Sequence, residues 1–127
     1  MQRMMLKSKI HRATVTGASV DYEGSISIDS ELMAAADILE HEQVHVLDID
    51  NGARLTTYAI AGAPGEICVN GAAARLVEIG DRVIILTYQW TPDDAARTHE
   101  PLIVRVDEKN CHIPGVAAGC VRSREGE

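Results

Sequence analysis

Apolar and polar residues alternate with a period of two along much of this chain, in short runs separated by glycine- and asparagine-containing turns. This spacing is typical of β-strands and not of helices. It predicts strands over residues 4–15, 22–28, 44–49, 54–60, 67–69, 82–88 and 101–106. Helices are predicted only over short segments, residues 31–36, 72–76 and 92–97. The pattern therefore predicts a mainly β protein, a compact β-barrel with short helices.

The clearest turn is Asn51-Gly52, which lies between two β-prone runs and predicts a hairpin. On the second strand of this hairpin, Arg54 and Tyr58 lie on one face, and alternation places Thr57 on the other face. A β-bulge, or the edge of the barrel, would be needed to bring these three side chains to one site.

Two further positions stand at predicted helix starts. Asp29 or Ser30 is expected to cap the helix over residues 31–36. Asn70-Gly71 precedes the helix over residues 72–76, whose free backbone N–H groups would suit a carboxylate. The alternative interpretation of Asn70-Gly71 is an ordinary turn.

Length, charge and cysteine content narrow the class of protein. A chain of 127 residues suits one domain, placed here at residues 1–107, with residues 108–127 as a flexible C-terminal tail. The net charge of −7 argues against a nucleic-acid or anionic-membrane partner. There is no long apolar run and no leader, so we expect a cytoplasmic protein and not a membrane or secreted one. Cys68, Cys111 and Cys120 lack metal-ligand spacing, so we expect reduced thiols and no metal site.

The dipeptide Gly24-Ser25 carries a possible covalent chemistry. A serine hydroxyl can attack the preceding carbonyl and convert the amide into an ester, and glycine permits the strained backbone that this needs. Loss of the Ser25 Cα proton then expels the acyl group and leaves dehydroalanine, which hydrolyses to ammonia and an N-terminal pyruvoyl group. Gly-Ser pairs also occur in ordinary turns, so the dipeptide alone does not decide between the two.

The first predicted strand places Lys7, Lys9 and His11 on one face. This row is either a solvated edge that discourages strand pairing or a cationic wall of an anion-binding pocket. A serine hydrolase that uses Ser25 with His11 is less attractive, because Ser25 lacks the Gly-x-Ser-x-Gly setting.

Five spaced motifs together resemble one enzyme family, the pyruvoyl-dependent L-aspartate α-decarboxylases, over about residues 1–107. The motifs are Lys9-Ile10-His11-Arg12, Tyr22-Glu23-Gly24-Ser25, Asn51-Gly52-x-Arg54, Thr57-Tyr58-Ala59-Ile60 and Asn70-Gly71-Ala72-Ala73-Ala74. The resemblance implies a double-psi β-barrel, a cytoplasmic homotetramer with active sites between subunits, and self-cleavage into a β chain (1–24) and an α chain (25–127). It also implies conversion of L-aspartate to β-alanine and carbon dioxide for pantothenate synthesis.

The same resemblance implies a role for each matching residue. Ser25 would become the pyruvoyl group, the only cofactor, and Tyr58 would donate a proton to the decarboxylated carbon. Arg54 would bind a substrate carboxylate. The residues implied in self-processing are Gly24, Ser25, Thr57, Tyr22 and His11, and those implied in substrate binding are Lys9, Arg54, Thr57, Asn70, Gly71, Ala72 and Ala73.

Two positions depart from the family pattern, and two other functions stay open. Leu47 stands where some relatives carry an aromatic residue, and the loop over residues 62–66 is shorter than in some members. The alternatives are pyruvoyl chemistry on another acidic amino acid, such as glutamate, and a non-catalytic β-barrel binding module. A maturation factor that assists cleavage is a possible partner.

Overall fold

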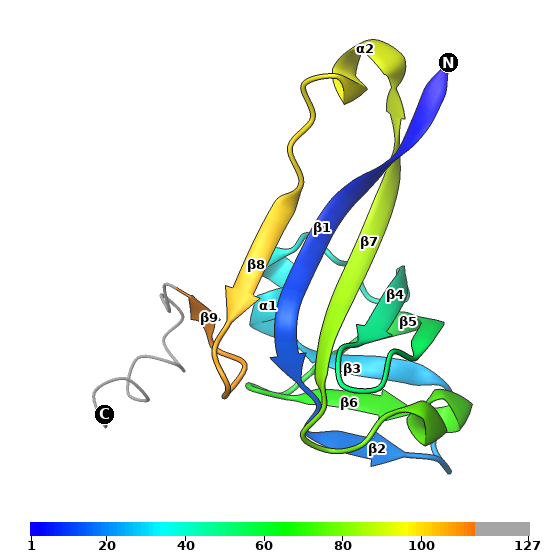
Figure 1. The fold of residues 1–127 in the computed structure, drawn as a ribbon, viewed down its shortest axis with the longest axis vertical. Helices are drawn as coiled ribbons and strands as arrows, with labels where there is room; N and C mark the ends of the chain where they lie inside the picture. The colour runs from blue at the N-terminus through cyan, green and yellow to red at the C-terminus, as the bar shows by residue number, and fades with distance from the viewer. Residues whose placement is uncertain (114–127) are drawn as a thin grey trace.

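The computed structural model of the chain describes residues 1–113 (Figure 1). Within that range the strands and short helical segments are, in chain order, β1 (Gln2–Thr14), β2 (Gly17–Ser19), β3 (Ser25–Asp29), α1 (Ser30–Ala35), β4 (Gln43–Asp48), β5 (Arg54–Gly62), β6 (Ile67–Asn70), the 3₁₀ helix η1 (Gly71–Leu76), β7 (Arg82–Pro92), α2 (Asp93–Ala96), β8 (Leu102–Val106) and β9 (His112–Ile113). The prediction of a mainly β fold with short helices is confirmed.

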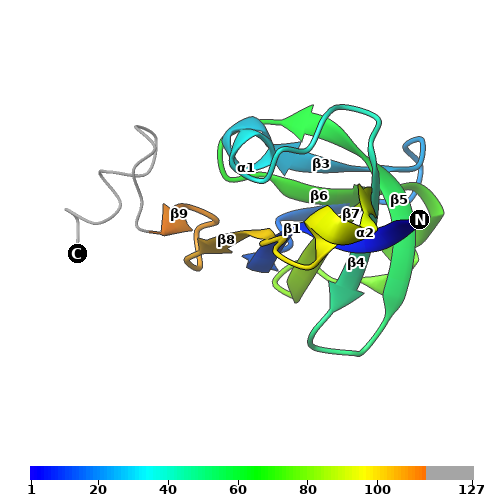
Figure 2. The same cartoon turned by 90° about the horizontal axis from the view of Figure 1, so that it is seen from above.

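The strands pair in the order β2-β6-β3-β5-β4-β7-β1-β8-β9. The sheet is mixed. Its parallel pairs are β1 with β8, β2 with β6 and β3 with β5, and its antiparallel pairs are β1 with β7, β3 with β6, β4 with β5, β4 with β7 and β8 with β9. In Figure 1, β2, β3 and β6 run across the lower part of the molecule, whereas β1, β7 and β8 run along its length. Figure 2 shows the strands from above, wrapped around a common interior. Strand order in the sheet thus differs greatly from strand order in the chain.

The hydrophobic core lies inside this wrapped sheet. It is formed by alternate residues of the strands and is covered on one side by Leu32 and Met33 of α1. The predicted cap of α1 is Asp29, whose Oδ1 accepts from the backbone N–H of Glu31 at 2.8 Å, while Oδ2 accepts from Gly65 at 2.8 Å. The fully buried core side chains include Ile10, Ile26, Ile28, Val44, Val46, Ile67, Val69, Val83 and Ile85.

β3 departs from the expected alternation because all five of its residues are buried. Ile26 and Ile28 face the core as predicted, but Ser25, Ser27 and Asp29 on the other face are covered too. Buried polar groups need hydrogen-bond partners, and the neighbouring β6 supplies one for both serines in Asn70. β3 is therefore a central strand with a buried polar face.

Two local predictions differ from the structure. Residues 17–19 form the short strand β2, which pairs with β6, where a connection was expected. Tyr22 and Gly24 lie in the turn before β3, which begins at Ser25 and not at Tyr22. In each case the sequence lacks a local signal, because the pairing partner is far away along the chain.

The β-domain continues past residue 107, where the predicted tail began. Asn110 is buried, and its side chain accepts from Thr14 N at 2.7 Å and donates to the carbonyl oxygens of Thr14 and Gly65, both at 2.9 Å. β9 then pairs with β8. Residues 108–113 are thus part of the fold, and residues 114–127 of the predicted tail, with Cys120, lie outside the described residues.

The cysteine prediction is confirmed for Cys68 and wrong for Cys111. Cys68 is a free thiol, whereas Cys111 is disulfide-bonded. In the described part of the chain, no helix is both long and apolar enough to cross a membrane.

Candidate active site

The strand register brings Ser25, Asn70 and Tyr58 together from three different strands. Ser25 is directly opposite Asn70 in the antiparallel pair of β3 and β6. In the parallel pair of β3 and β5, Ile26 is opposite Ala59. The residues just before them, Ser25 and Tyr58, therefore lie next to one another on adjacent strands. These three residues, with Gly71, are called the serine group below.

The Ser25 hydroxyl is buried and held by Asn70. The side-chain amide of Asn70 donates to Ser25 Oγ at 2.9 Å and to Ser27 Oγ at 3.3 Å. Ser25 is 2% exposed and Asn70 4%. Ser25 Oγ donates to the carbonyl oxygen of Glu23 at a long 3.5 Å. Ser25 Oγ thus accepts from an amide, donates only weakly and is shielded from water. This environment fixes the hydroxyl in position and leaves it free to react.

Sequence reasoning did not identify Ser27 and Cys68, which complete this network. The Cys68 thiol donates to Asn70 Oδ1 at 3.4 Å, which leaves the amide nitrogen facing the two serines. The available signal was periodicity, since Ser27 and Cys68 each lie two residues from a predicted site residue on a strand and hence on the same face.

Gly71 is the glycine that the geometry of this site requires. Its φ is +78°, and a Cβ atom there would lie 2.6 Å from Gly24 Cα and 2.8 Å from Gly24 N. Any other residue would therefore be strained and would collide with the backbone of the Gly24-Ser25 segment. Gly24 itself does not have a positive φ, and a Cβ atom added to it would meet nothing within 4 Å. The sequence suggested that Gly24 would adopt the strained backbone that only glycine permits. The structure has the positive φ at Gly71 instead.

Tyr58 and Thr57 lie on β5 beside an open depression of about 550 Å³, which His41, Gln43 and Thr56 also line. Tyr58 is 36% exposed, and its ring is 6.1 Å from that of His41, centroid to centroid. Thr57 is half-buried. Among the hydrogen bonds of the described residues, none joins Thr57 to Gly24.

Arg54 is on the same strand as Tyr58, at the other end of the β4–β5 pairing. β4 and β5 pair without a register shift from Gln43–Tyr58 to Leu47–Arg54, so the bulge considered for β5 is absent. Arg54 is four residues from Tyr58, roughly 13 Å along a strand. The bulges of this region lie instead in β1, between Leu6 and Ser8 and between His11 and Ala13.

Lys9, His11 and Arg54 lie on the outer face of β5, β4, β7, β1 and β8, and on β5 this face also carries Tyr58. Residues opposite one another in adjacent strands share a face, and the core lies on the other one. Two rows define this outer face: Arg54, Leu47, Ile84, His11 and Arg105, and next to it Thr56, His45, Leu86, Lys9 and Ile103. Lys7 does not join it, because it stands at a bulge and forms an ion pair with Glu42 at 2.7 Å.

Lys9 and His11 on β1 are separated from the serine group within one chain. Four strand spacings lie between β3 and β1, roughly 19 Å along the curved sheet. Lys9 and His11 are half-buried, and Arg54 is exposed. The structure therefore brings the serine group together, places Arg54 further along the strand of Tyr58, and leaves Lys9 and His11 on a distant strand.

His11 has an unusual environment on the outer face. Its Nδ1 atom is buried without a hydrogen-bond partner. Burial, and then the charges of Lys9, Arg12 and Arg105, lower the pKa of the His11 imidazole below its usual value of 6.5. The neutral imidazole is thus favoured near pH 7.

The remaining predicted residues flank the serine group. Tyr22 is 59% exposed in the turn before Gly24, and its carbonyl oxygen is 3.3 Å from the Cβ position at Gly71. In η1, Ala72 is exposed and Ala73 is half-buried against the core. Asn70 and Gly71 therefore lie directly beside Ser25 and Gly24.

Comparison with known proteins agrees with this arrangement. The family model described as aspartate decarboxylase matches residues 1–113. The chain is 59% identical to the aspartate 1-decarboxylase of Desulfitobacterium hafniense strain DCB-2 over 112 residues, which cover 87% of this chain and 88% of the relative. It is 50% identical to that of Heliobacterium modesticaldum, over 100% of this chain and 95% of the relative, and 55% identical to that of Listeria monocytogenes, over 89% and 90%.

The family assignment agrees with the fold as well as with the sequence. The family is known for a double-psi β-barrel and for a pyruvoyl group formed by self-cleavage at a serine. The mainly β structure, with a buried serine at the start of a strand, has the matching features. The chain belongs to the aspartate decarboxylase family.

Proposed function

We propose that this chain cleaves itself between Gly24 and Ser25 and then converts L-aspartate to β-alanine and carbon dioxide for pantothenate synthesis. Family membership supports the reaction. The observation that carries the proposal for this chain is the buried Ser25 hydroxyl, which accepts a hydrogen bond from Asn70. The adjacent Gly24 backbone lies so close to position 71 that only glycine fits there. The family resemblance implies that the enzyme works in the cytoplasm.

Self-cleavage uses only atoms of the chain and one water molecule. Ser25 Oγ attacks the carbonyl carbon of Gly24, the C–N bond breaks, and the amide becomes an ester with a free amine on Ser25. Removal of the Ser25 Cα proton breaks the bond between Cβ and the ester oxygen, which releases the carboxylate of Gly24 and leaves dehydroalanine. Hydrolysis of its imine form gives ammonia and the pyruvoyl group.

Three residues have roles in this step under the proposal. Asn70 holds Ser25 Oγ in place through its 2.9 Å hydrogen bond. Thr57 is proposed to donate to the Gly24 carbonyl oxygen as negative charge develops there, and removal of one such donor typically costs about 2.7–4 kcal/mol of barrier. Gly71 keeps the space that the scissile segment occupies.

Decarboxylation needs an acceptor for the two electrons that carbon dioxide leaves behind. The pyruvoyl group, once formed, supplies an electrophilic carbonyl conjugated with an amide, which no natural side chain provides. Tyr58 is proposed to deliver a proton to the former Cα from the edge of the depression that it lines. The carboxylate that is kept suits the planar guanidinium of Arg54 better than a lysine ammonium.

The separation of Arg54 from Ser25 supports a site shared between two copies of the chain. In one copy, Lys9, His11 and Arg54 stand on the outer face and point away from the barrel core. Half-buried apolar residues, Leu47, Ile84, Leu86 and Ile103, accompany these cations, as expected of a surface that a second protein covers. We propose the homotetramer that the family resemblance implies, with the outer face of one subunit completing the serine group of its neighbour.

The first test is an intact mass spectrum of the purified protein under denaturing conditions. The expected result is two chains split between Gly24 and Ser25, with the mass of the larger one corresponding to a pyruvoyl group in place of serine. The Ser25→Ala variant, as the control, should remain one chain. A wild-type chain that stays whole after prolonged warm incubation and after mixing with host extract, which would supply a maturation factor, contradicts the proposal. Turnover of L-aspartate against L-glutamate then decides the substrate.

The shared site has its own test. Chains with Ser25→Ala and chains with Arg54→Ala should each be inactive, whereas their co-expressed mixture should regain activity because one subunit supplies Ser25 and the other Arg54. A mixture of confirmed mixed composition that stays inactive would show that both residues must come from one chain.

A further inference from the structure

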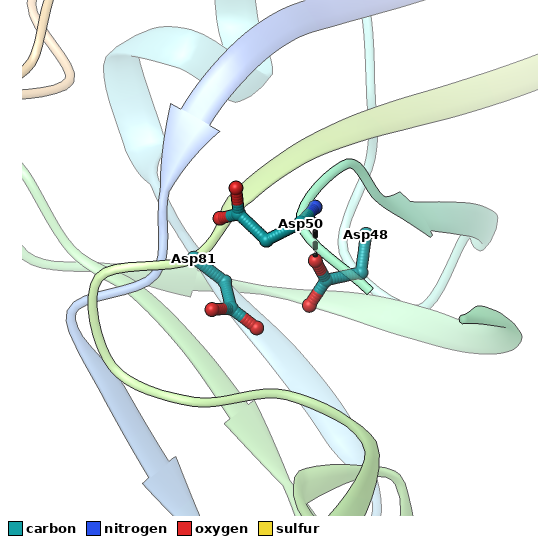
Figure 3. Close-up of side chains that lie close together, drawn as sticks. All are labelled: Asp48, Asp50 and Asp81. Atoms are coloured by element: carbon teal, nitrogen blue, oxygen red, sulfur yellow. Dashed lines mark hydrogen bonds between the residues drawn. The ribbon is translucent and has the colours of Figure 1, made fainter. Parts of the chain in front are cut away.

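Three carboxylates converge at the opposite end of β4 from the depression beside Tyr58 (Figure 3). Asp48 ends β4, Asp50 is in the turn of the β4–β5 hairpin, and Asp81 is in the loop before β7. One oxygen atom of each lies within 4.8 Å of the others. This group, called the aspartate cluster, contains none of the residues assigned to the serine group or the outer face.

Backbone donors hold one oxygen of each carboxylate. Asp48 Oδ1 accepts from the N–H groups of Asp50 at 2.8 Å and Asn51 at 3.3 Å. Asp50 Oδ2 accepts from Arg82 N at 2.8 Å, and Asp81 Oδ2 accepts from Glu78 N at 3.0 Å. The three side chains are therefore fixed in orientation by the chain, with a second oxygen on each left for another partner.

The second oxygen of Asp48 has no such partner. Asp48 is only 2% exposed, and its Oδ2 atom is buried without a hydrogen-bond donor. In Figure 3 this oxygen points to the side on which the Asp81 carboxylate lies. A buried carboxylate oxygen that faces another carboxylate is unfavourable unless positive charge lies between them.

The described part of the chain places Arg75 in the lining of the adjacent cavity but pairs no cation with the cluster. None of the ion pairs within residues 1–113 includes a member of the aspartate cluster. Burial, and then a hydrogen bond with Asp81 that a shared proton would supply, raise the pKa of the Asp48 carboxyl to about 6. Two species can occupy the space between the oxygens, a proton or a metal cation.

We propose that the aspartate cluster binds a divalent cation of the size of Ca²⁺. Carboxylate oxygens are hard ligands, which suit Ca²⁺ or Mg²⁺ and not the softer metals. Oxygen atoms within 4.8 Å of one another can share one Ca²⁺ at its usual Ca–O distance of about 2.3–2.6 Å, and Ca²⁺ accepts irregular geometry, whereas Mg²⁺ demands a near-ideal octahedron at about 2.0–2.1 Å. An adjacent cavity of about 330 Å³, lined by Asp50 and Asp81 among others, has room for the water ligands that complete the coordination.

The cation would add a link between two segments that the β4–β7 pairing, with Asp48 opposite Val83, and the Ile49 N–H on the Arg82 carbonyl oxygen at 2.8 Å already join. The hairpin with Asp48 and Asp50 leads into Arg54, and the loop with Asp81 follows η1, which begins at Gly71. Besides the backbone contacts above, Asn51 Nδ2 donates to the Leu76 carbonyl oxygen at 2.9 Å across the same junction. A bound ion therefore stabilises the junction between the Arg54 hairpin and the segment that follows the serine group.

The test is calcium titration of chelator-treated, dialysed protein at pH 7.5, by calorimetry and by thermal unfolding, with Mg²⁺ titrated in parallel. The informative variant is Asp48→Asn, because asparagine keeps the acceptor for Asp50 and Asn51 and can donate to Asp81, so it should fold. Glu108→Gln is the matched control, since it removes the same charge at an exposed position in the β8–β9 turn.

Wild type and Glu108→Gln should each bind one Ca²⁺ per chain and unfold at a higher temperature with Ca²⁺ than without it. Asp48→Asn should bind Ca²⁺ at least roughly tenfold more weakly, because ligand charge sets the affinity of such sites. No binding by wild type up to 10 mM Ca²⁺, or equal binding by Asp48→Asn, would overturn the proposal and leave a shared proton as the occupant. Binding of Mg²⁺ as tight as that of Ca²⁺ would overturn the choice of cation.

Discussion

The contact between Gly71 and Gly24 gives the sharpest prediction, for Gly71→Ala. A φ of +78° costs an L-residue about 1–2 kcal/mol. The new Cβ would be 2.6 Å from Gly24 Cα, about 0.9 Å inside the roughly 3.5 Å at which two carbon atoms make good contact. Overpacking of this kind adds about 1–3 kcal/mol. We therefore expect the uncleaved chain to lose about 2–5 kcal/mol of unfolding free energy.

The larger effect should be on self-cleavage, because the atoms that must move belong to the scissile segment. A displacement of about 1 Å at a reacting group can cost roughly a hundredfold in rate. Conversion of the purified precursor, followed on a denaturing gel, should accordingly slow by about that factor in Gly71→Ala. The unfolding free energy is measured by urea titration in the non-cleaving Ser25→Ala background.

A matched control separates backbone strain from the collision. Gly52 has a φ of +79°, but a Cβ atom there would meet nothing within 4 Å. Gly52→Ala should therefore lose only the conformational cost of about 1–2 kcal/mol and should still cleave. Normal cleavage by a folded Gly71→Ala, or equal slowing in both variants, would refute the steric reasoning.

Three further outcomes are expected. Thr57→Val should slow cleavage, since valine keeps the shape but cannot donate to the Gly24 carbonyl oxygen; unchanged cleavage kinetics on a denaturing gel would remove that role. Arg54→Ala should mature normally yet lose L-aspartate turnover, because its partner is the substrate; a mature variant that makes β-alanine at the wild-type rate would contradict this. Because folding lowers the pKa of His11, the unfolded chain binds a proton at this histidine more readily than the folded chain, so the unfolding free energy should fall as pH drops through about 6.5. The urea midpoint should therefore fall less between pH 8 and pH 5.5 in His11→Asn than in wild type. An equal fall in the two proteins would argue against this role of His11.

Short sequence motifs predicted the structural elements that are determined by neighbouring residues in the chain. Asn51-Gly52 gave the β4–β5 hairpin, and Asp29 gave the cap of α1, because the residues that decide these structures are adjacent in the chain. The tail boundary failed for the opposite reason. Asn110 is held by Thr14, 96 residues away, and no pattern near residue 110 announces that partner.

The candidate site shows the same division. The chemistry of Gly24-Ser25 could be inferred from two adjacent residues, but the hydrogen bond of Asn70 to Ser25 joins residues 45 apart, and the family resemblance named Asn70 only as a substrate-binding residue. The resemblance gave a set of site residues without their arrangement. It did not indicate that β5 pairs without a bulge, which leaves Arg54 remote from Ser25 in a single chain.

The pairing of β1 determines what a cut after Gly24 would do to the molecule. β1 is hydrogen-bonded along its length to β7 and, in parallel, to β8, while β2 pairs with β6, and all three partners lie on the far side of the cut in sequence. The small fragment would thus supply two strands of the barrel, β1 and β2. Both would stay hydrogen-bonded to the large fragment after the peptide bond is broken. The two polypeptides should copurify and unfold together as one cooperative unit, so native size measurements cannot report maturation.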